Sequence, residues 1–288
     1  MNAISPTFQE LRRRNEGALI GYVMAGDPTP KHTPKIVDAL LAGGADIVEL
    51  GIPFSDPIAD GPTLQRAAVR ALEAGTTPKK VFDIVGAIKN THDVPIVVMT
   101  YYNIIYQMGI DEFCSASEKS GVNGIIAPDL PLEEAAPYKD TATGYGLDSI
   151  FLAASSTSDE RLERLVNVSS GFLYLVSASG VTGARETVQN ESVASVKRTS
   201  AVIRERIPLA VGFGLSLPSH IQTMVDNGAN AAIVGSRFTQ IVEQNLDNGE
   251  KMLGNLRQCA QTLKEGTSLS RTHNVEQKAP PSHKNAPL

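Results

Sequence analysis

Short apolar runs alternate with longer amphipathic segments along most of the chain. The short runs are nearly continuous in apolar residues, which is typical of parallel strands that helices cover. Glycines stand where helices would end, just before several of these runs. The eight predicted strands are residues 18–24, 46–50, 95–100, 124–127, 149–153, 172–177, 208–213 and 231–235.

Eight strand–helix units in 288 residues predict a single (β/α)8 TIM barrel of the α/β class. A doubly wound parallel sheet is the weaker alternative. An extra helix near residues 5–14 precedes the first strand, and a final helix lies near residues 250–264. Residues 1–265 therefore form the predicted catalytic domain. Residues 266–288 are polar and rich in proline, so we expect a disordered C-terminal tail.

Composition and charge restrict the kind of partner. The chain is 42% hydrophobic and 20% charged, as expected for a globular protein, and its net charge of -5 is not gathered into long blocks. We therefore expect no binding to nucleic acid or membrane. The N-terminus lacks the apolar run of a signal peptide, and the two cysteines form no Cys-x-x-Cys pattern. These features predict a cytoplasmic protein that binds small molecules or proteins.

One predicted strand, residues 46–50, contains an acidic residue, Glu49. Side chains of a barrel strand point alternately to the interior and to the helices. Val48 and Leu50 suit the helix face, so Glu49 is predicted to point into the barrel, at the end where TIM barrels hold their catalytic groups. Burial would raise its pKa. A structural ion pair is the alternative, but no predicted strand carries a Lys or Arg to form one.

A long loop from Gly51 to Gly61 follows this strand, and Pro53 and Pro57 stiffen it. No Lys or Arg occurs from residue 43 to residue 65, so the acids of the loop lack a local counter-charge. The length and stiffness favour a loop that forms part of a site. Asp60 before Gly61 is equally typical of a simple turn, and the residues alone leave both interpretations open.

Glycines also stand at the ends of the last two predicted strands, in Gly212-Phe213-Gly214 and Gly235-Ser236. Barrels commonly bind phosphate at these two positions, on backbone N–H groups and a helix N-terminus. The alternative is that these glycines only form tight turns. Their occurrence at both of the last two strands favours a phosphate site. The small residues 177–183 predict a mobile lid after the sixth strand.

The sequence lacks the residue patterns that several kinds of chemistry require. The five histidines are scattered, so we predict no metal site, and no predicted strand carries a lysine for a Schiff base. Cys114 and Cys259 lie in predicted helices, where core packing is the expected role. Carboxylates remain as the candidates for acid–base chemistry.

The segment VELGIPFSDPIADGP, residues 48–62, resembles the signature of the tryptophan synthase alpha subunit family. The similarity extends from Leu19 to about Glu265 through GYVMAGDP, MTYYN, PDLPLEE, SASGVTG, GFG and VGS, in that order. One departure is LAASSTSDER, since the family usually has a proline before the threonine or serine.

This resemblance implies a lyase that cleaves indole-3-glycerol phosphate to indole and glyceraldehyde 3-phosphate in a retro-aldol reaction. It implies no cofactor in this chain. The indole would pass to a beta subunit that carries pyridoxal phosphate, in an alpha2beta2 complex. Glu49 matches the catalytic acid and base of the family, and Asp60 matches its partner at the indole N–H. Other matched positions are Tyr22, Thr100, Tyr102, Tyr174 and Phe213 around the indole, Thr182 in the lid, and Gly183, Gly214, Gly235 and Ser236 at the phosphate.

Ordinary barrel filling remains the alternative for each aromatic residue. Three other functions also stay open at this point. The chain could be another phosphate-binding barrel, such as a sugar-phosphate isomerase or a prenyl transferase. It could release indole without a beta partner, or bind its ligand only to regulate that partner. The pair Glu49 and Asp60 speaks against the first and the last of these.

Overall fold

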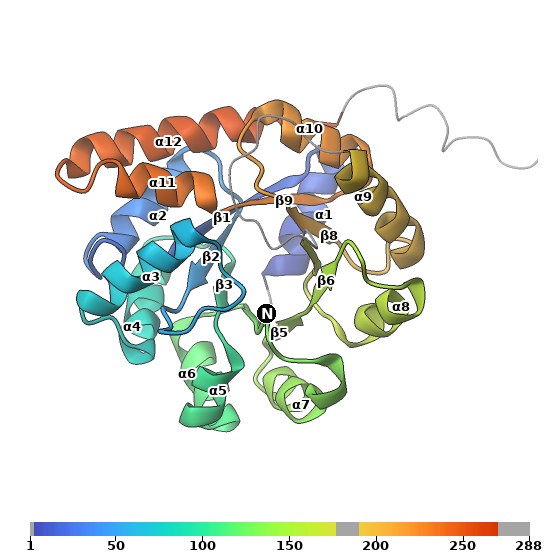
Figure 1. Cartoon of the computed structure of the whole chain (residues 1–288), viewed down its shortest axis with the longest axis horizontal. Coiled ribbons are helices and arrows are strands. Elements are labelled where there is room, and N and C mark those ends of the chain that lie inside the picture. Colours follow the sequence, from blue (N-terminus) through green and yellow to red (C-terminus); the bar gives the residue numbers. More distant parts are fainter. Residues whose placement is uncertain (1–2, 177–189, 270–288) are drawn as a thin grey trace, which may run out of the picture.

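The computed structural model describes residues 3–176 and 190–269 (Figure 1). Within these ranges the apolar runs form one parallel sheet, with the strand order β5-β4-β3-β2-β1-β9-β8-β7-β6. The strands are β1 (Ala18–Met24), β2 (Ile47–Gly51), β3 (Ile96–Met99), β4 (Gly124–Ile126), β5 (Asp148–Ile150), β6 (Leu152–Ala154), β7 (Leu173–Val176), β8 (Leu209–Gly212) and β9 (Ala231–Val234).

The fifth predicted strand is divided into β5 and β6, and only Phe151 separates them. Its pairing changes sides at this residue, because Ile150 lies opposite Ile126 of β4 whereas Leu152 lies opposite Tyr174 of β7. The two ends of the strand order are therefore consecutive parts of one strand, and the sheet closes into a barrel. Closure confirms the predicted TIM barrel and excludes the doubly wound sheet, whose edge strands stay unpaired.

Helices surround the barrel (Figure 1). None of the described helices is long and apolar enough to cross a membrane. The helices are α1 (Ile4–Arg13), α2 (Thr33–Ala42), α3 (Pro62–Glu73), α4 (Pro78–Lys89), α5 (Tyr102–Met108), α6 (Ile110–Ser120), the 3-10 helix η1 (Leu132–Glu134), α7 (Ala136–Gly144), α8 (Asp159–Val168), α9 (Asn190–Ile203), α10 (Pro218–Asp226), α11 (Ser236–Glu243) and α12 (Gly249–Glu265).

Helix α1 covers the N-terminal end of the barrel. Its residues Ile4, Phe8 and Leu11 are buried, in the same apolar cluster as the side chains that fill the barrel interior. The ring of Phe8 meets that of Phe172 edge to face, with 6.1 Å between the centroids. Apolar side chains therefore close this end of the barrel.

The two faces of β2 separate as the sequence predicts. Val48 and Leu50 belong to the apolar cluster between the sheet and the helices, whereas Ile47 belongs to the cluster inside the barrel. Glu49 has the parity of Ile47 and is fully buried. Its carboxyl group therefore faces the interior, near the C-terminal end of the strand.

The packed chain continues past the end of α12. Gly266 and Thr267 are buried, and the Thr267 carbonyl accepts a hydrogen bond from the Gly17 N–H at 2.8 Å. The Leu269 N–H donates to the Asn15 carbonyl at 3.0 Å. Packing thus reaches beyond residue 265, the predicted domain boundary. Residues 270–288 lie outside the described chain, and the disordered tail stays a prediction there.

Candidate active site

Glu49 lies inside the barrel without any partner for its charge. Within the described residues, neither of its carboxylate oxygens accepts a hydrogen bond. Burial raises its pKa to about 8, and the negative charge of Asp60 adds to this effect. The alternative prediction, a structural ion pair, is therefore wrong for the part of the chain that the structure describes.

Asp60 lies near Glu49, at the end of the loop after β2. Burial raises its pKa to about 6, although a hydrogen bond with Tyr101 acts in the opposite direction. At neutral pH, Glu49 is therefore mostly a neutral acid, whereas Asp60 is mostly ionised. Two carboxyl groups whose environments separate their pKa values are typical of an acid–base site.

Tyr101 holds the Asp60 loop, a role that the sequence prediction missed. Its hydroxyl accepts a hydrogen bond from the Ala59 N–H at 2.9 Å and also bonds to Asp60. Its ring stacks on Phe54 at the other end of the same loop, with 5.2 Å between the centroids. The loop is therefore anchored on one buried phenol.

Tyr102, which we predicted in the pocket, lies elsewhere. Its ring packs edge to face on Tyr138, 6.4 Å away, beside the cluster between sheet and helices. The structure therefore does not bring Tyr102 together with Glu49. Strand β3 ends at Met99 and α5 begins at Tyr102, so the alternation of a strand does not extend to this pair of tyrosines. The segment MTYYN contains both tyrosines. The conformation of the turn after β3 determines which of them lies near the carboxyl pair.

The structure brings two other predicted tyrosines, Tyr22 and Tyr174, close to the carboxyl pair. Tyr22 of β1 lies opposite Glu49 in the sheet. Burial raises the pKa of both phenols well above its usual value, and the charges of Glu49 and Asp60 raise it further. Glycines leave room for the two rings. A methyl group at Gly51 would overlap the Tyr22 hydroxyl, and one at Gly212 would lie 2.7 Å from the Tyr174 ring.

Some of the buried polar atoms at this end of the barrel have no hydrogen-bond partner among the described residues. The Tyr22 hydroxyl and the hydroxyl of Thr100, just after β3, have no hydrogen-bond partner among the described residues, like both oxygens of Glu49. Buried polar groups in proteins are nearly always hydrogen-bonded. Three residues of this kind inside the C-terminal end of a barrel favour a site that binds a polar ligand.

The turns after β8 and β9 contain the residues that we predicted at the phosphate. Gly214 has a φ of +70°, which favours glycine. Gly235 precedes α11, and Ser236 is the first residue of that helix, so the free N–H groups of the first turn and the Ser236 hydroxyl lie together. A methyl group at Gly235 would lie 3.0 Å from the Tyr22 ring, which places this turn beside the interior tyrosine. Phe213 is buried in the cluster between sheet and helices.

An ion-pair network connects the helices that follow these two regions. Arg70 of α3 donates to both carboxylate oxygens of the buried Asp27, at 2.7 and 2.8 Å, and to Glu243 of α11 at 3.1 Å. Arg66 of α3 donates to the same Glu243 at 2.6 and 2.8 Å. The network therefore fixes the helix after the Asp60 loop against the helix that begins at Ser236.

Two predicted residues cannot be placed, because Thr182 and Gly183 lie outside the described residues, as does the rest of the predicted lid from Ser177 onward. Over the described ranges, no group of three or more His, Cys, Asp or Glu side chains is arranged to hold a metal ion.

Comparison with known sequences identifies the family. A family model described as tryptophan synthase alpha chain matches residues 8–268. The chain is 46% identical over 253 residues to the tryptophan synthase alpha chain of Methanoregula boonei, which covers 88% of this chain and 95% of that protein. It is 39% identical over 271 residues to the alpha chain of Escherichia fergusonii, which covers 93% and 99%.

Solved structures agree. The tryptophan synthase complex from Pyrococcus furiosus contains a chain with 37% identity and a TM-score of 0.80, covering 86% of this chain and 98% of that one. Mycobacterium tuberculosis tryptophan synthase contains one with 33% identity and a TM-score of 0.83, covering 93% and 98%. The chain therefore belongs to the tryptophan synthase alpha chain family, the carbon–carbon lyases that cleave indole-3-glycerol phosphate in tryptophan biosynthesis.

Proposed function

We propose that Glu49 carries out the proton transfers by which this chain cleaves indole-3-glycerol phosphate to indole and glyceraldehyde 3-phosphate, and that Asp60 stabilises the charge that develops on the indole. The observation that supports these roles most strongly is the buried, unpartnered carboxyl group of Glu49 beside a second acid. A structural carboxyl group would have a cation or hydrogen-bond donors around it.

The bond that breaks joins C3 of the indole to the glycerol carbon that bears a hydroxyl group. Glu49, held mostly protonated by burial, delivers its proton to C3, and the ring becomes an iminium-like cation that accepts the electrons of the breaking bond. The Glu49 carboxylate then takes the hydroxyl proton as the glycerol carbon becomes the aldehyde of glyceraldehyde 3-phosphate. Glu49 is protonated again at the end, so the proton balance closes.

Asp60 stabilises the positive charge that develops on the indole ring. Its carboxylate is mostly ionised at neutral pH and would accept a hydrogen bond from the ring N–H. No Lys or Arg occurs from residue 43 to residue 65, so the sequence provides no local cation that would neutralise the Asp60 carboxylate. Tyr22, Thr100, Tyr174 and Tyr101 would enclose the indole.

The phosphate of the substrate would bind at the turns after β8 and β9. Gly214, Gly235 and Ser236 offer backbone N–H groups and a hydroxyl at the start of α11. As the family resemblance implies, we expect Gly183 to contact the phosphate as well, Phe213 to contact the indole, and Thr182 to contact the Asp60 loop from the lid. This arrangement sets the two ends of the substrate at two separate regions of the barrel mouth.

We further propose that the chain assembles with a beta subunit as an alpha2beta2 complex. In this family the pyridoxal phosphate belongs to the beta subunit, and the alpha chain uses no cofactor. The proposed contact face is the C-terminal mouth, where the loop residue Ile58 is 85% exposed and Tyr106 of α5 is 68% exposed. Exposed apolar side chains of this kind are typical of interfaces. The free Cys114 and Cys259 suit a cytoplasmic enzyme.

The test of the catalytic assignment is Glu49→Gln, which keeps the size of the side chain and removes the acid. Indole release by the purified variant, with and without a beta subunit, should fall by ~10²–10⁴-fold. Asp56→Asn is the matched control, since Asp56 is an exposed acid in the same loop and should leave the rate of the isolated chain nearly unchanged. Normal turnover by Glu49→Gln would show that another group moves the proton.

A further inference from the structure

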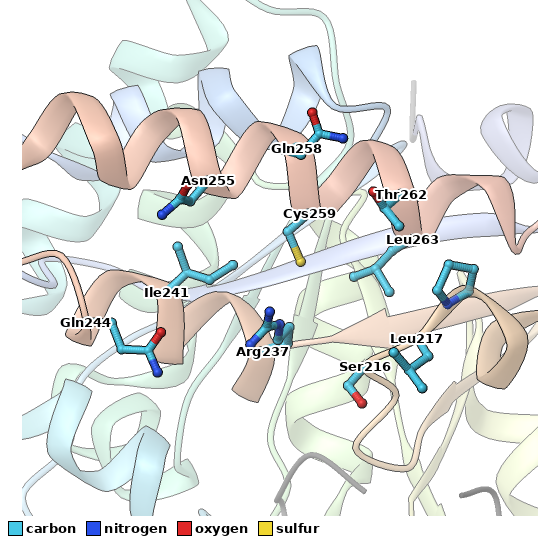
Figure 2. Close-up of a pocket in the computed structure, with 11 residues that line it drawn as sticks. Ser216, Leu217, Arg237, Ile241, Gln244, Asn255, Gln258, Cys259, Thr262 and Leu263 are labelled. Atoms are coloured by element: carbon cyan, nitrogen blue, oxygen red, sulfur yellow. The ribbon is translucent and has the colours of Figure 1, made fainter. Parts of the chain in front are cut away.

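A pocket of about 380 Å³ lies outside the barrel, between α11 and α12 (Figure 2). The loop Ser216–Pro218 forms one end of it, and none of the side chains of the carboxyl pair or the tyrosine cluster lines it. Its volume falls in the range of ~300–1,000 Å³ that small-molecule sites occupy. The proposed cleavage of the substrate does not involve this pocket.

Arg237 is the single charged residue among the eleven that line the pocket. Within the described chain, it forms no ion pair, in contrast to Arg66 and Arg70 nearby. Its partner is the Cys259 thiol, which receives a hydrogen bond from the guanidinium. Burial raises the pKa of this thiol even against the Arg237 charge, so the thiol stays neutral at pH 7 and leaves that charge uncompensated.

The rest of the lining suits an organic anion. Gln244, Asn255 and Thr262 supply uncharged polar groups, and Ile241 supplies an apolar surface. Figure 2 shows Cys259 of α12 directed toward Arg237 of α11, so the guanidinium and the thiol lie next to each other in the pocket. A guanidinium binds carboxylate or phosphate oxygens through two parallel hydrogen bonds.

We propose that this pocket is a second binding site, for a small organic anion whose carboxylate or phosphate oxygens pair with Arg237. The site is separate from that of the substrate, but it adjoins the phosphate turns in the sequence. Arg237 follows Ser236 directly, and Ser216 lies two residues after Gly214.

Cys259 is a reporter inside the pocket, since it is partly exposed whereas Cys114 is fully buried. The experiment compares the alkylation rates of Cys259 by iodoacetate, a carboxylate, and by neutral iodoacetamide, resolved by peptide mass spectrometry. The ratio of the two rates cancels any change in thiolate fraction. Arg237→Gln should lower the ratio about five-fold, the factor for one charge pair at about 4 Å in water. Arg237→Lys keeps the charge and should keep the ratio.

Arg257→Gln is the matched control, because Arg257 is exposed on the same helix and does not line the pocket. Its ratio should equal that of the unaltered chain. In a second arm, inorganic phosphate and acetate are each added during the iodoacetamide reaction. Saturable protection of Cys259 by either one, lost in Arg237→Gln, supports the site and identifies which oxygens it prefers. An unchanged ratio in Arg237→Gln, protection that survives this substitution, or protection by neither anion overturns the proposal.

Discussion

The two ends of the barrel differ in the side chains that occupy them. At the N-terminal end, α1 inserts Ile4, Phe8 and Leu11, and the ring of Phe8 meets Phe172. At the C-terminal end, the buried atoms include a carboxyl group and two hydroxyls without hydrogen-bond partners among the described residues. The apolar side chains of the first end contribute to stability, whereas the polar groups of the second carry a cost in stability that a bound ligand would offset.

The residues that stabilise the fold and the residues proposed for the reaction therefore lie at opposite ends of the barrel. Substitutions at the closed end should change stability without changing the reaction. Substitutions at the open end should change the reaction, and some of them should even stabilise the chain, because they remove a buried charge. The three predictions that follow test this separation, beginning with the loss of a buried ring.

Phe8→Ala should lower the free energy of unfolding by ~3–5 kcal/mol, the usual cost of removing a buried phenyl ring. The turnover of the folded fraction should stay close to that of the unaltered chain, because Phe8 lies at the end of the barrel opposite Glu49. Urea denaturation gives the first quantity, and indole release at low temperature gives the second. A variant that folds well and turns over slowly would break the separation between the two ends.

Tyr101→Phe should lower kcat/KM by ~10–100-fold, the equivalent of one hydrogen bond to a charged group. The substitution removes the hydroxyl that bonds to Ala59 and Asp60, so the loop loses its anchor and the pKa of Asp60 rises. Tyr102→Phe is the matched control and should be nearly neutral, since Tyr102 packs on Tyr138 instead. A larger effect for Tyr102 than for Tyr101 would contradict the assignment of the pocket.

The stability gained by Glu49→Gln should depend on pH. The pKa of Glu49 is raised from 4.5 to about 8 in the folded chain, so the unfolded chain releases this proton first as the pH increases. The contribution of Glu49 to stability is therefore complete below pH 4.5 and is lost progressively up to about pH 8.

Urea denaturation at pH 4.5 and at pH 8 measures this linkage. The advantage of Glu49→Gln over the unaltered chain should be near zero at the lower pH. It should reach ~4 kcal/mol at the higher pH, since the pKa is raised from 4.5 to about 8 and each unit of pKa shift corresponds to about 1.4 kcal/mol. The pKa of Asp60 is also raised, from 3.8 to about 6, but burial is the largest cause of this shift and acts in both proteins. An advantage that is equal at both pH values would mean that Glu49 is not a buried acid.

The barrel and the direction of Glu49 could be predicted from the sequence because each depends on local periodicity. The parity of Ile47, Val48 and Leu50 leaves Glu49 only the interior, and the structure agrees. The division of the fifth strand at Phe151 could not be predicted in this way. It results from a change of partner strand, which is a long-range property of the closed sheet.

The candidate site was less accessible to sequence reasoning wherever it depends on turns. The choice between Tyr101 and Tyr102 is made by the angle at which the chain leaves β3 and enters α5, and neighbouring residues of the same type carry no signal about that angle. Arg237 was missed for a similar reason. Its lack of an ion pair is visible only once α11 and α12 are placed side by side.

The close packing of Tyr22 between two glycines also has a genetic consequence. A methyl group at Gly51 would overlap the Tyr22 hydroxyl, and one at Gly235 would lie 3.0 Å from its ring, so these three positions on different strands and turns occupy one shared space. Gly51→Ala alone should therefore be harmful, whereas a smaller residue at position 22 should make it tolerable. Mutations at these sites would then show strong epistasis, and only certain orders of substitution would be open to an evolving lineage.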